Sequence, residues 1–198
     1  MKLLARFFEG PPTRILVEDP EAGDIFPFTV RVFRAQFPSQ VFPGEIELGE
    51  QAWQALLAEE RQLLLLSAQR YLGSTERSPL ALQRWMERRL LPASWSQALE
   101  AELRDQSFLS EERFAALWMR RHEERGGRPL WLLRRQLQAL GVRRAVAESV
   151  AFDEVAALRR YVKVRFPRLK EERLLHARLR RRGFSTSLIR AALAPDQP

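Results

Sequence analysis

Short apolar runs rich in β-branched residues lie in the first quarter of the chain, at residues 14–18 and 28–33. Pro and Gly residues stand between and around them. Runs of this length, bounded by turn-forming residues, are typical of strands. We therefore predict a small region of two or three strands. Its turns are expected at Pro20, Gly23, Pro27 and Pro43-Gly44.

A helical pattern begins after Gly49 and continues to Ala194, with apolar residues at spacings of three and four. Within it, a frame of apolar positions repeats around three anchors, Leu90, Gly141 and Gly183. The frame holds the positions eight and four before each anchor and one, five and nine after it. Its fifteen members are Leu82, Met86, Leu91, Trp95 and Leu99; Leu133, Leu137, Val142, Val146 and Val150; and Leu175, Leu179, Phe184, Leu188 and Ala192. Such self-similarity predicts an internal repeat.

Each repeat is expected to contain three short helices, which gives nine helices in all. The second helix of a repeat would end at its anchor, where Gly141 or Gly183 can adopt a left-handed conformation. The third would start a few residues later, with Ser94 and Ser185 as candidate N-caps. The predicted fold class is mainly α: three tandem three-helix repeats forming an elongated curved body, with a small β-containing N-terminal region. The predicted boundaries are 1–57 for the N-terminal region and the start of a linking helix, then 58–107, 108–151 and 152–198 for the repeats.

Charge is distributed unevenly over the 198 residues, whose formal net charge is +8. Residues 1–60 hold 5 Lys+Arg against 10 Asp+Glu, a net of −5, while residues 61–198 hold 28 against 15, a net of +13. A basic region of this size favours an anionic partner, such as a phosphate backbone or an acidic groove of a protein. A solvated helical surface, or a coding bias toward arginine, would leave the same composition.

Twelve cations of the helical region are the candidate residues for binding such an anionic partner. They are Arg121, Arg125, Arg128, Arg134, Arg135, Arg159, Arg160, Lys163, Arg178, Arg180, Arg181 and Arg182.

The sequence carries no recognisable set of catalytic residues. It has no cysteine and no glycine-rich phosphate loop, and a turn explains Gly126-Gly127 better than a nucleotide site does. His122 and His176 fall in different repeats, and the serines near helix starts are explained by capping. We expect no enzymatic activity, no metal and no cofactor. No apolar stretch approaches the length of a membrane span, so we also expect no membrane partner and a cytoplasmic protein.

Two segments resemble the RecX regulators of bacterial recombination. Residues 109–121 (LSEERFAALWMRR) with residues 132–142 (LLRRQLQALGV) resemble the central repeat of that family, and residues 174–189 (LLHARLRRRGFSTSLI) resemble its final repeat. The resemblance covers about residues 61–194. The N-terminal strands, followed by Pro43-Gly44, resemble a β-containing extension of some members. The sequence departs from the family at Leu90, where a glycine would be expected, and at Ser110, where an aspartate is common.

The resemblance implies a non-enzymatic regulator of homologous recombination and DNA repair. Such a regulator binds the RecA nucleoprotein filament and inhibits its strand exchange and ATP hydrolysis. It also implies a monomer that contacts single- or double-stranded DNA without sequence specificity. A helix-turn-helix-like DNA-binding regulator is the alternative, although no helix presents an evident set of base-reading side chains and asparagine is absent. A scaffold without a nucleoprotein partner would fit the repeats but leave the basic charge unexplained.

Overall fold

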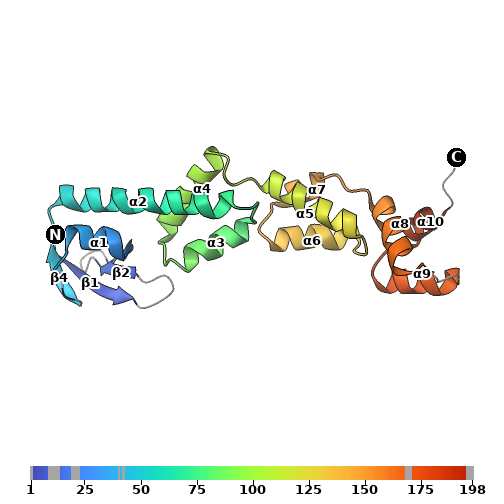
Figure 1. Ribbon diagram of the computed structural model, residues 1–198, viewed down its shortest axis with the longest axis horizontal. Helices are drawn as coiled ribbons and strands as arrows, with labels where there is room; N and C mark the ends of the chain where they lie inside the picture. The colour runs from blue at the N-terminus through green and yellow to red at the C-terminus, as the bar shows by residue number, and fades with distance from the viewer. Residues whose placement is uncertain are drawn as a thin grey trace. The chain divides into compact units, whose positions relative to one another are not determined.

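The structure is a computed structural model that describes residues 2–8, 14–18, 23–39, 41, 43–167 and 171–194. The chain divides into two compact units, Met1–Leu109 and Ser110–Pro198, called here the N-terminal unit and the C-terminal unit (Figure 1). The four-part division predicted from the sequence stays a prediction.

The N-terminal unit contains a four-stranded antiparallel sheet with the strand order β3-β2-β1-β4. Its strands are β1 (Lys2–Phe8), β2 (Arg14–Glu18), β3 (Ile25–Thr29) and β4 (Gly44–Glu47). Strand β2 coincides with the predicted run, whereas the pattern did not predict β1 or β4. Helix α1 (Val30–Gln36) packs against β2 and β3 and against the long helix α2 (Figure 1).

The prediction of a strand over residues 28–33 is wrong beyond Thr29, because helix α1 begins at Val30. The Thr29 hydroxyl accepts the Val32 N–H at 3.4 Å and caps the helix. Val32 and Phe33 are both buried, so packing overrides their strand propensity. The predicted turn at Pro27 is also wrong, since Pro27 lies within β3 and pairs with Leu16 of β2. An edge strand tolerates proline because one side of it needs no ladder bond. Pro20 lies outside the described residues.

A buried ion pair joins the sheet to α2 in the N-terminal unit. Arg14 of β2 donates from Nη1 to Glu60 Oε1 at 2.6 Å, and both side chains are almost fully buried. The other carboxylate oxygen of Glu60 accepts the Thr29 N–H at 2.8 Å and the Thr29 hydroxyl at 3.0 Å. Burial raises the pKa of Glu60, and these bonds and the Arg14 charge oppose that rise. A single carboxylate thus links α2, β2 and the start of α1.

The nine helices predicted after Gly49 are confirmed within the described residues, and no strand is found among them. They are α2 (Glu50–Gly73), α3 (Pro79–Glu87), α4 (Ala93–Asp105), α5 (Glu111–Arg125), α6 (Leu130–Ala139), α7 (Arg144–Ser149), α8 (Glu154–Arg165), α9 (Glu172–Arg181) and α10 (Thr186–Leu193). The mainly α fold class with a small β-containing N-terminal region is therefore confirmed.

All fifteen positions of the repeated frame are buried or half-buried, with Leu91, Val150 and Leu188 in the half-buried class. Helices α5–α7 share one hydrophobic cluster and α8–α10 share another. The frame residues of α3 and α4 lie in a larger cluster that also contains α2 and the sheet.

The three anchors adopt the same backbone conformation. The φ angle is 86° at Gly141, 92° at Gly183 and 58° at Leu90, so all three are left-handed. In each case the residue after the anchor donates its N–H to a carbonyl five residues earlier, as Val142 does to Leu137 at 3.1 Å. The matching bonds are Phe184 to Leu179 at 3.3 Å and Leu91 to Met86 at 3.4 Å. These are Schellman helix ends, and Leu90 makes one without the glycine that the geometry favours.

Of the two candidate N-caps, Ser185 is confirmed and Ser94 is wrong. The Ser185 hydroxyl accepts the Leu188 N–H at 3.2 Å. Helix α4, however, already begins at Ala93 after an N-cap at Pro92. Pro92 has a φ angle of −56° and a ψ angle of 152°, so it is extended and the first helical residue is Ala93. Ser94 therefore lies inside the first turn.

Candidate basic interface of the C-terminal unit

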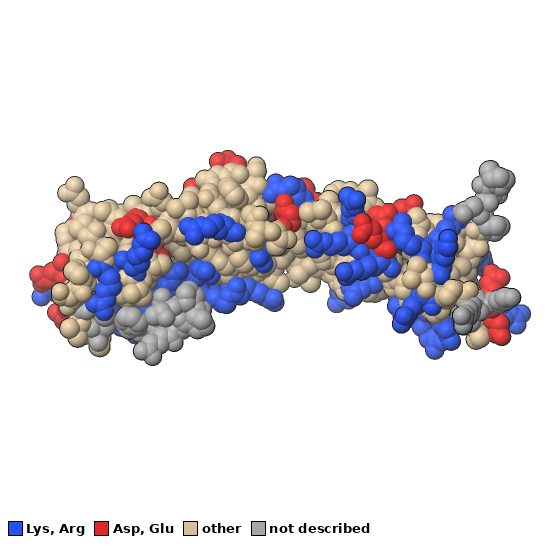
Figure 2. All heavy atoms as spheres, in the orientation of Figure 1, with Lys and Arg blue, Asp and Glu red and all other residues tan. Residues whose placement is uncertain are grey.

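All twelve candidate cations lie in the C-terminal unit, on α5, α6, α8 and α9 and in the turns after α5 and α9. Figure 2 shows Lys and Arg side chains over these helices on the face in view. They divide into three groups according to the partners of their charged atoms.

Three of the cations bind helix-end carbonyl groups, which makes them structural. Arg159 donates to the carbonyls of Ala191 and Ala192 at 3.1 Å each, at the C-terminal end of α10. Arg134 donates to the Glu148 carbonyl of α7 at 3.0 Å, and Arg160 to the Glu123 carbonyl of α5 at 2.9 Å. The last carbonyl groups of a helix have no partner within the helix, so these arginines satisfy them.

Three further cations remain exposed but are oriented by a neighbouring side chain. Arg128 donates to the Gln136 amide oxygen at 3.1 Å. The Arg178 guanidinium lies 5.8 Å from the centre of the Phe166 ring, and that of Arg182 lies 5.2 Å from the centre of the Tyr161 ring. Cation–π contacts of this kind leave the outer edge of the guanidinium available to an anion.

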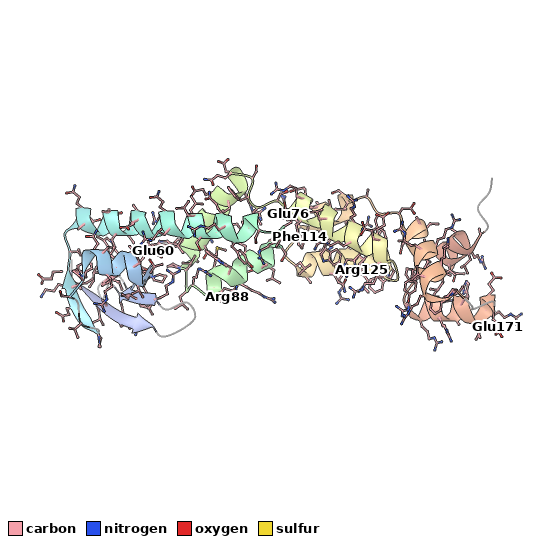
Figure 3. All side chains as sticks on the ribbon, viewed as in Figure 1. Glu60, Glu76, Arg88, Phe114, Arg125 and Glu171 are labelled. Atoms are coloured by element: carbon pink, nitrogen blue, oxygen red, sulfur yellow. The ribbon has the colours of Figure 1, made fainter. Side chains whose placement is uncertain are left out.

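The remaining six cations are exposed and form no hydrogen bond or ion pair with any residue that the structure describes. They are Arg121, Arg125, Arg135, Lys163, Arg180 and Arg181. We call these six the free basic set. Arg125 and Phe114 lie at opposite ends of α5 (Figure 3), with the apolar end packed into the core of α5–α7. The free basic set is the part of the twelve that can meet an outside partner without breaking an internal bond.

His122 lies beside this set but adds little charge to it. Its ring centre is 4.0 Å from that of Trp118. Burial lowers the pKa of His122, and the charges of Arg128 and Arg125 lower it further. The imidazole is therefore kept neutral near physiological pH, which suits a packing role rather than proton transfer.

The Gly126-Gly127 turn, which connects α5 to α6, packs closely against α8. This contact brings the basic residues of α5 and α6 near those of α8. A Cβ at Gly126 would collide with the carbonyl oxygen of Ala157, and one at Gly127 would lie 2.6 Å from the Tyr161 ring. Glu154 of α8 accepts the Leu130 N–H at 2.8 Å and so caps α6. The sequence predicted a turn at the two glycines but gave no sign of these partners.

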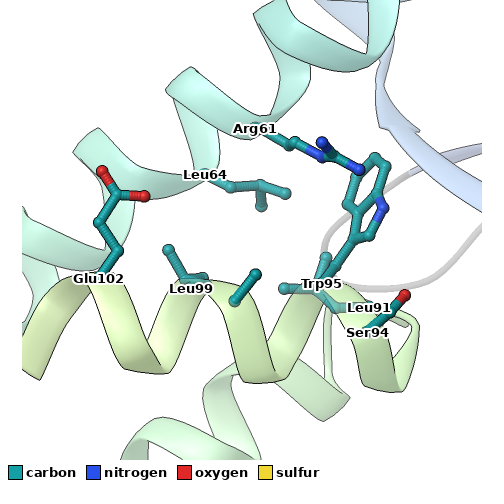
Figure 4. A pocket seen from close by; sticks show the side chains of 8 residues that line it. Arg61, Leu64, Leu91, Ser94, Trp95, Leu99 and Glu102 are labelled. Carbon is teal, nitrogen blue, oxygen red and sulfur yellow. The ribbon is translucent and has the colours of Figure 1, made fainter.

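The N-terminal unit has an apolar hollow of about 290 Å³ between α2 and α4 (Figure 4). Its lining residues are Arg61, Leu64, Leu91, Ser94, Trp95, Ala98, Leu99 and Glu102. The Arg61 guanidinium lies 5.3 Å from the centre of the Trp95 ring. The hydroxyl of Ser94 and the carboxylate of Glu102 lie at opposite ends of this hollow (Figure 4), so its lining brings no nucleophile and base together.

The described residues also offer no candidate metal site. Within them, no group of three or more His, Asp or Glu side chains is placed to hold a metal ion. None of the helices in the described ranges combines the length and the hydropathy needed to span a membrane.

No protein-family model matches the sequence, and a search of curated proteins found no match either. Among solved structures, the chain is similar to one described as the crystal structure of regulatory protein RecX, with a TM-score of 0.54 and 19% sequence identity. The similarity covers 88% of this chain and 92% of that one. It therefore extends over nearly the whole of both folds. The chain thus has a RecX-like fold, as the resemblance of residues 61–194 implied.

Proposed function

We propose that this protein is a non-enzymatic regulator of homologous recombination and DNA repair that binds the RecA nucleoprotein filament and inhibits its strand exchange and ATP hydrolysis. The observation that supports this most directly is the free basic set on a RecX-like fold. A RecA filament on DNA is an extended anionic assembly, and exposed guanidinium groups are suited to phosphates and carboxylates.

Tandem repeats are suited to a partner that is itself built from repeating subunits. Three successive three-helix segments can contact successive filament subunits through individually weak contacts. Linked contacts raise the effective concentration of each other and can increase avidity by about 10²–10⁴. The proposal therefore favours assembled filament over free RecA or naked DNA.

The test measures ATP hydrolysis by RecA filaments on single-stranded DNA while this protein is titrated. The first variant replaces Arg125, Arg135 and Arg181 of the free basic set with Glu. Its inhibition should weaken by at least about tenfold, because each exposed contact contributes on the order of 0.5–1 kcal/mol and reversal adds repulsion. Inhibition by the unchanged protein should also weaken as salt rises.

A matched control replaces Arg120, Arg144 and Arg190, which lie outside the twelve candidates, with Glu. Arg120 and Arg144 pair with Glu124 and Glu148 on their own helices. The control has the same net charge as the test variant and should retain most of the inhibition. Equal loss in both variants would mean that only net charge matters. No inhibition by the unchanged protein, with tight binding to one duplex sequence, would favour the helix-turn-helix-like alternative.

A further inference from the structure

Trp131 is the exposed tryptophan of this chain. Trp53, Trp85 and Trp95 are buried and Trp118 is half-buried, whereas Trp131 is 56% exposed on α6. The position is not part of the repeated frame, and its counterpart before the anchor Gly183 is the exposed Arg173. Core packing therefore does not account for an indole at this site.

The indole is held in place rather than left mobile. Its Nε1–H donates to the Gly183 carbonyl at 3.1 Å. The ring edge lies so close to this turn that a Cβ on Gly183 would come within 3.2 Å of Trp131 Cζ2. The left-handed glycine that ends α9 thus also fixes the orientation of an aromatic ring from α6.

Basic residues lie near Trp131 along α6 and next to the glycine that holds its ring. Arg135 lies one helical turn further along α6, and Arg128 lies three residues before Trp131. On the other side, Arg182 directly precedes Gly183 and is oriented by the Tyr161 ring. Glu154 is the carboxylate that bonds to the neighbouring Leu130 N–H, so its charge is directed to the helix end.

We propose that Trp131 is a stacking platform for an unpaired base of single-stranded DNA, with Arg128, Arg135 and Arg182 contacting the phosphates on either side of that base. A fixed, exposed aromatic ring within a basic surface is the arrangement with which proteins bind single strands without reading their sequence. Duplex DNA keeps its bases stacked inside the helix, so the platform favours single strands. This inference builds on the basic surface of the proposed function and adds the class of nucleic acid and the mode of contact.

The test compares the binding of two labelled 20-nucleotide strands by fluorescence anisotropy. One strand is oligo-dT, and the other has the same backbone with abasic sites in place of the bases. Trp131→Ala should weaken binding of oligo-dT by about 5- to 150-fold, the range of one lost base stack, and change binding of the abasic strand by less than about twofold. Trp131→Phe should restore most of the affinity because it keeps an aromatic face.

Leu174→Ala is the matched control, since Leu174 is a 47% exposed apolar residue on α9 in the same unit. It should bind both strands as the unchanged protein does, and circular dichroism should show equal helix content in all variants. A second readout is intrinsic fluorescence, where oligo-dT should quench the unchanged protein and quench Trp131→Phe much less.

Equal losses on the two strands would overturn the inference, because the ring would then only support the basic surface. So would an unchanged affinity in Trp131→Ala. Since the assay uses bare strands without RecA, it can fail while filament inhibition holds, and it can succeed while filament inhibition fails.

Discussion

At the scale of single residues, the basic side chains of the C-terminal unit differ in the partners of their charged atoms. Arg159 completes the carbonyl end of α10, while Arg125 and Arg181 are exposed and belong to the free basic set. Replacing Arg159 would therefore test folding as well as binding, because it removes a cap together with a charge. Only the free basic set allows the two effects to be separated.

The pKa of His122 is the residue-scale prediction. NMR titration should place it below the ordinary value of 6.5, because burial and then the charges of Arg128 and Arg125 disfavour the imidazolium. The unfolded chain then binds more protons than the folded one just below pH 6.5. The contribution of His122 to the free energy of unfolding should therefore be fully present above pH 6.5 and should decrease as the pH falls toward the pKa of the folded state.

His122→Gln should flatten this pH dependence in urea titrations, and Arg128→Ala should move the pKa of His122 upward. A measured pKa at or above 6.5 in the unchanged protein would contradict the burial of the ring against Trp118.

At the scale of elements, the three Schellman ends differ in sequence but not in geometry. Two of them use glycine at the left-handed position, and the third uses Leu90 with a φ angle of 58°. The bonds from Leu91 to Met86 and from Val142 to Leu137 close both kinds of helix end alike. The repeat is thus encoded by the apolar frame and the end geometry together, rather than by a glycine at each anchor.

Leu90→Gly is the element-scale prediction. It should raise the free energy of unfolding by about 0.5–1 kcal/mol, since a left-handed non-glycine residue is strained by about 1–2 kcal/mol and Leu90 buries only part of its side chain. Gly141→Ala, the matched change in the opposite direction, should lower it by about 1–2 kcal/mol. Urea unfolding of both variants measures the difference. A loss of stability in Leu90→Gly larger than that in Gly141→Ala would show that the Leu90 side chain outweighs its backbone strain.

At the scale of the whole molecule, the radius of gyration tests the elongated shape that three tandem repeats predict. A compact globule of 198 residues would have a radius of gyration of about 16 Å. An elongated arrangement of repeats predicts a clearly larger value and an asymmetric distance distribution in small-angle scattering. A value near that of the globule would contradict the elongated body that the repeated frame implies.

The sequence by itself determined the helical part of this protein. Buried positions on short helices must recur with the helical period. The frame from Leu82 to Ala192 therefore identified six of the nine helices and their apolar faces, and the spacings of three and four after Gly49 indicated the other three. The run 14–18 likewise identified β2, because a strand buried on both faces needs consecutive apolar residues. The sequence also shows where basic side chains are numerous, but it does not show which groups those side chains bond to.

Tertiary structure alone decided the rest, because it depends on partners distant in the chain. Whether residues 30–33 continue a strand or start a helix depends on Thr29, whose hydroxyl caps α1 and also bonds to Glu60. Whether an arginine is structural or available depends on the helix end that it reaches, as Arg159 reaches Ala192. Trp131 is a platform only because Gly183, fifty-two residues later, holds its ring. Local pattern determines which face of an element is apolar, whereas long-range contacts determine which polar atoms remain without a partner.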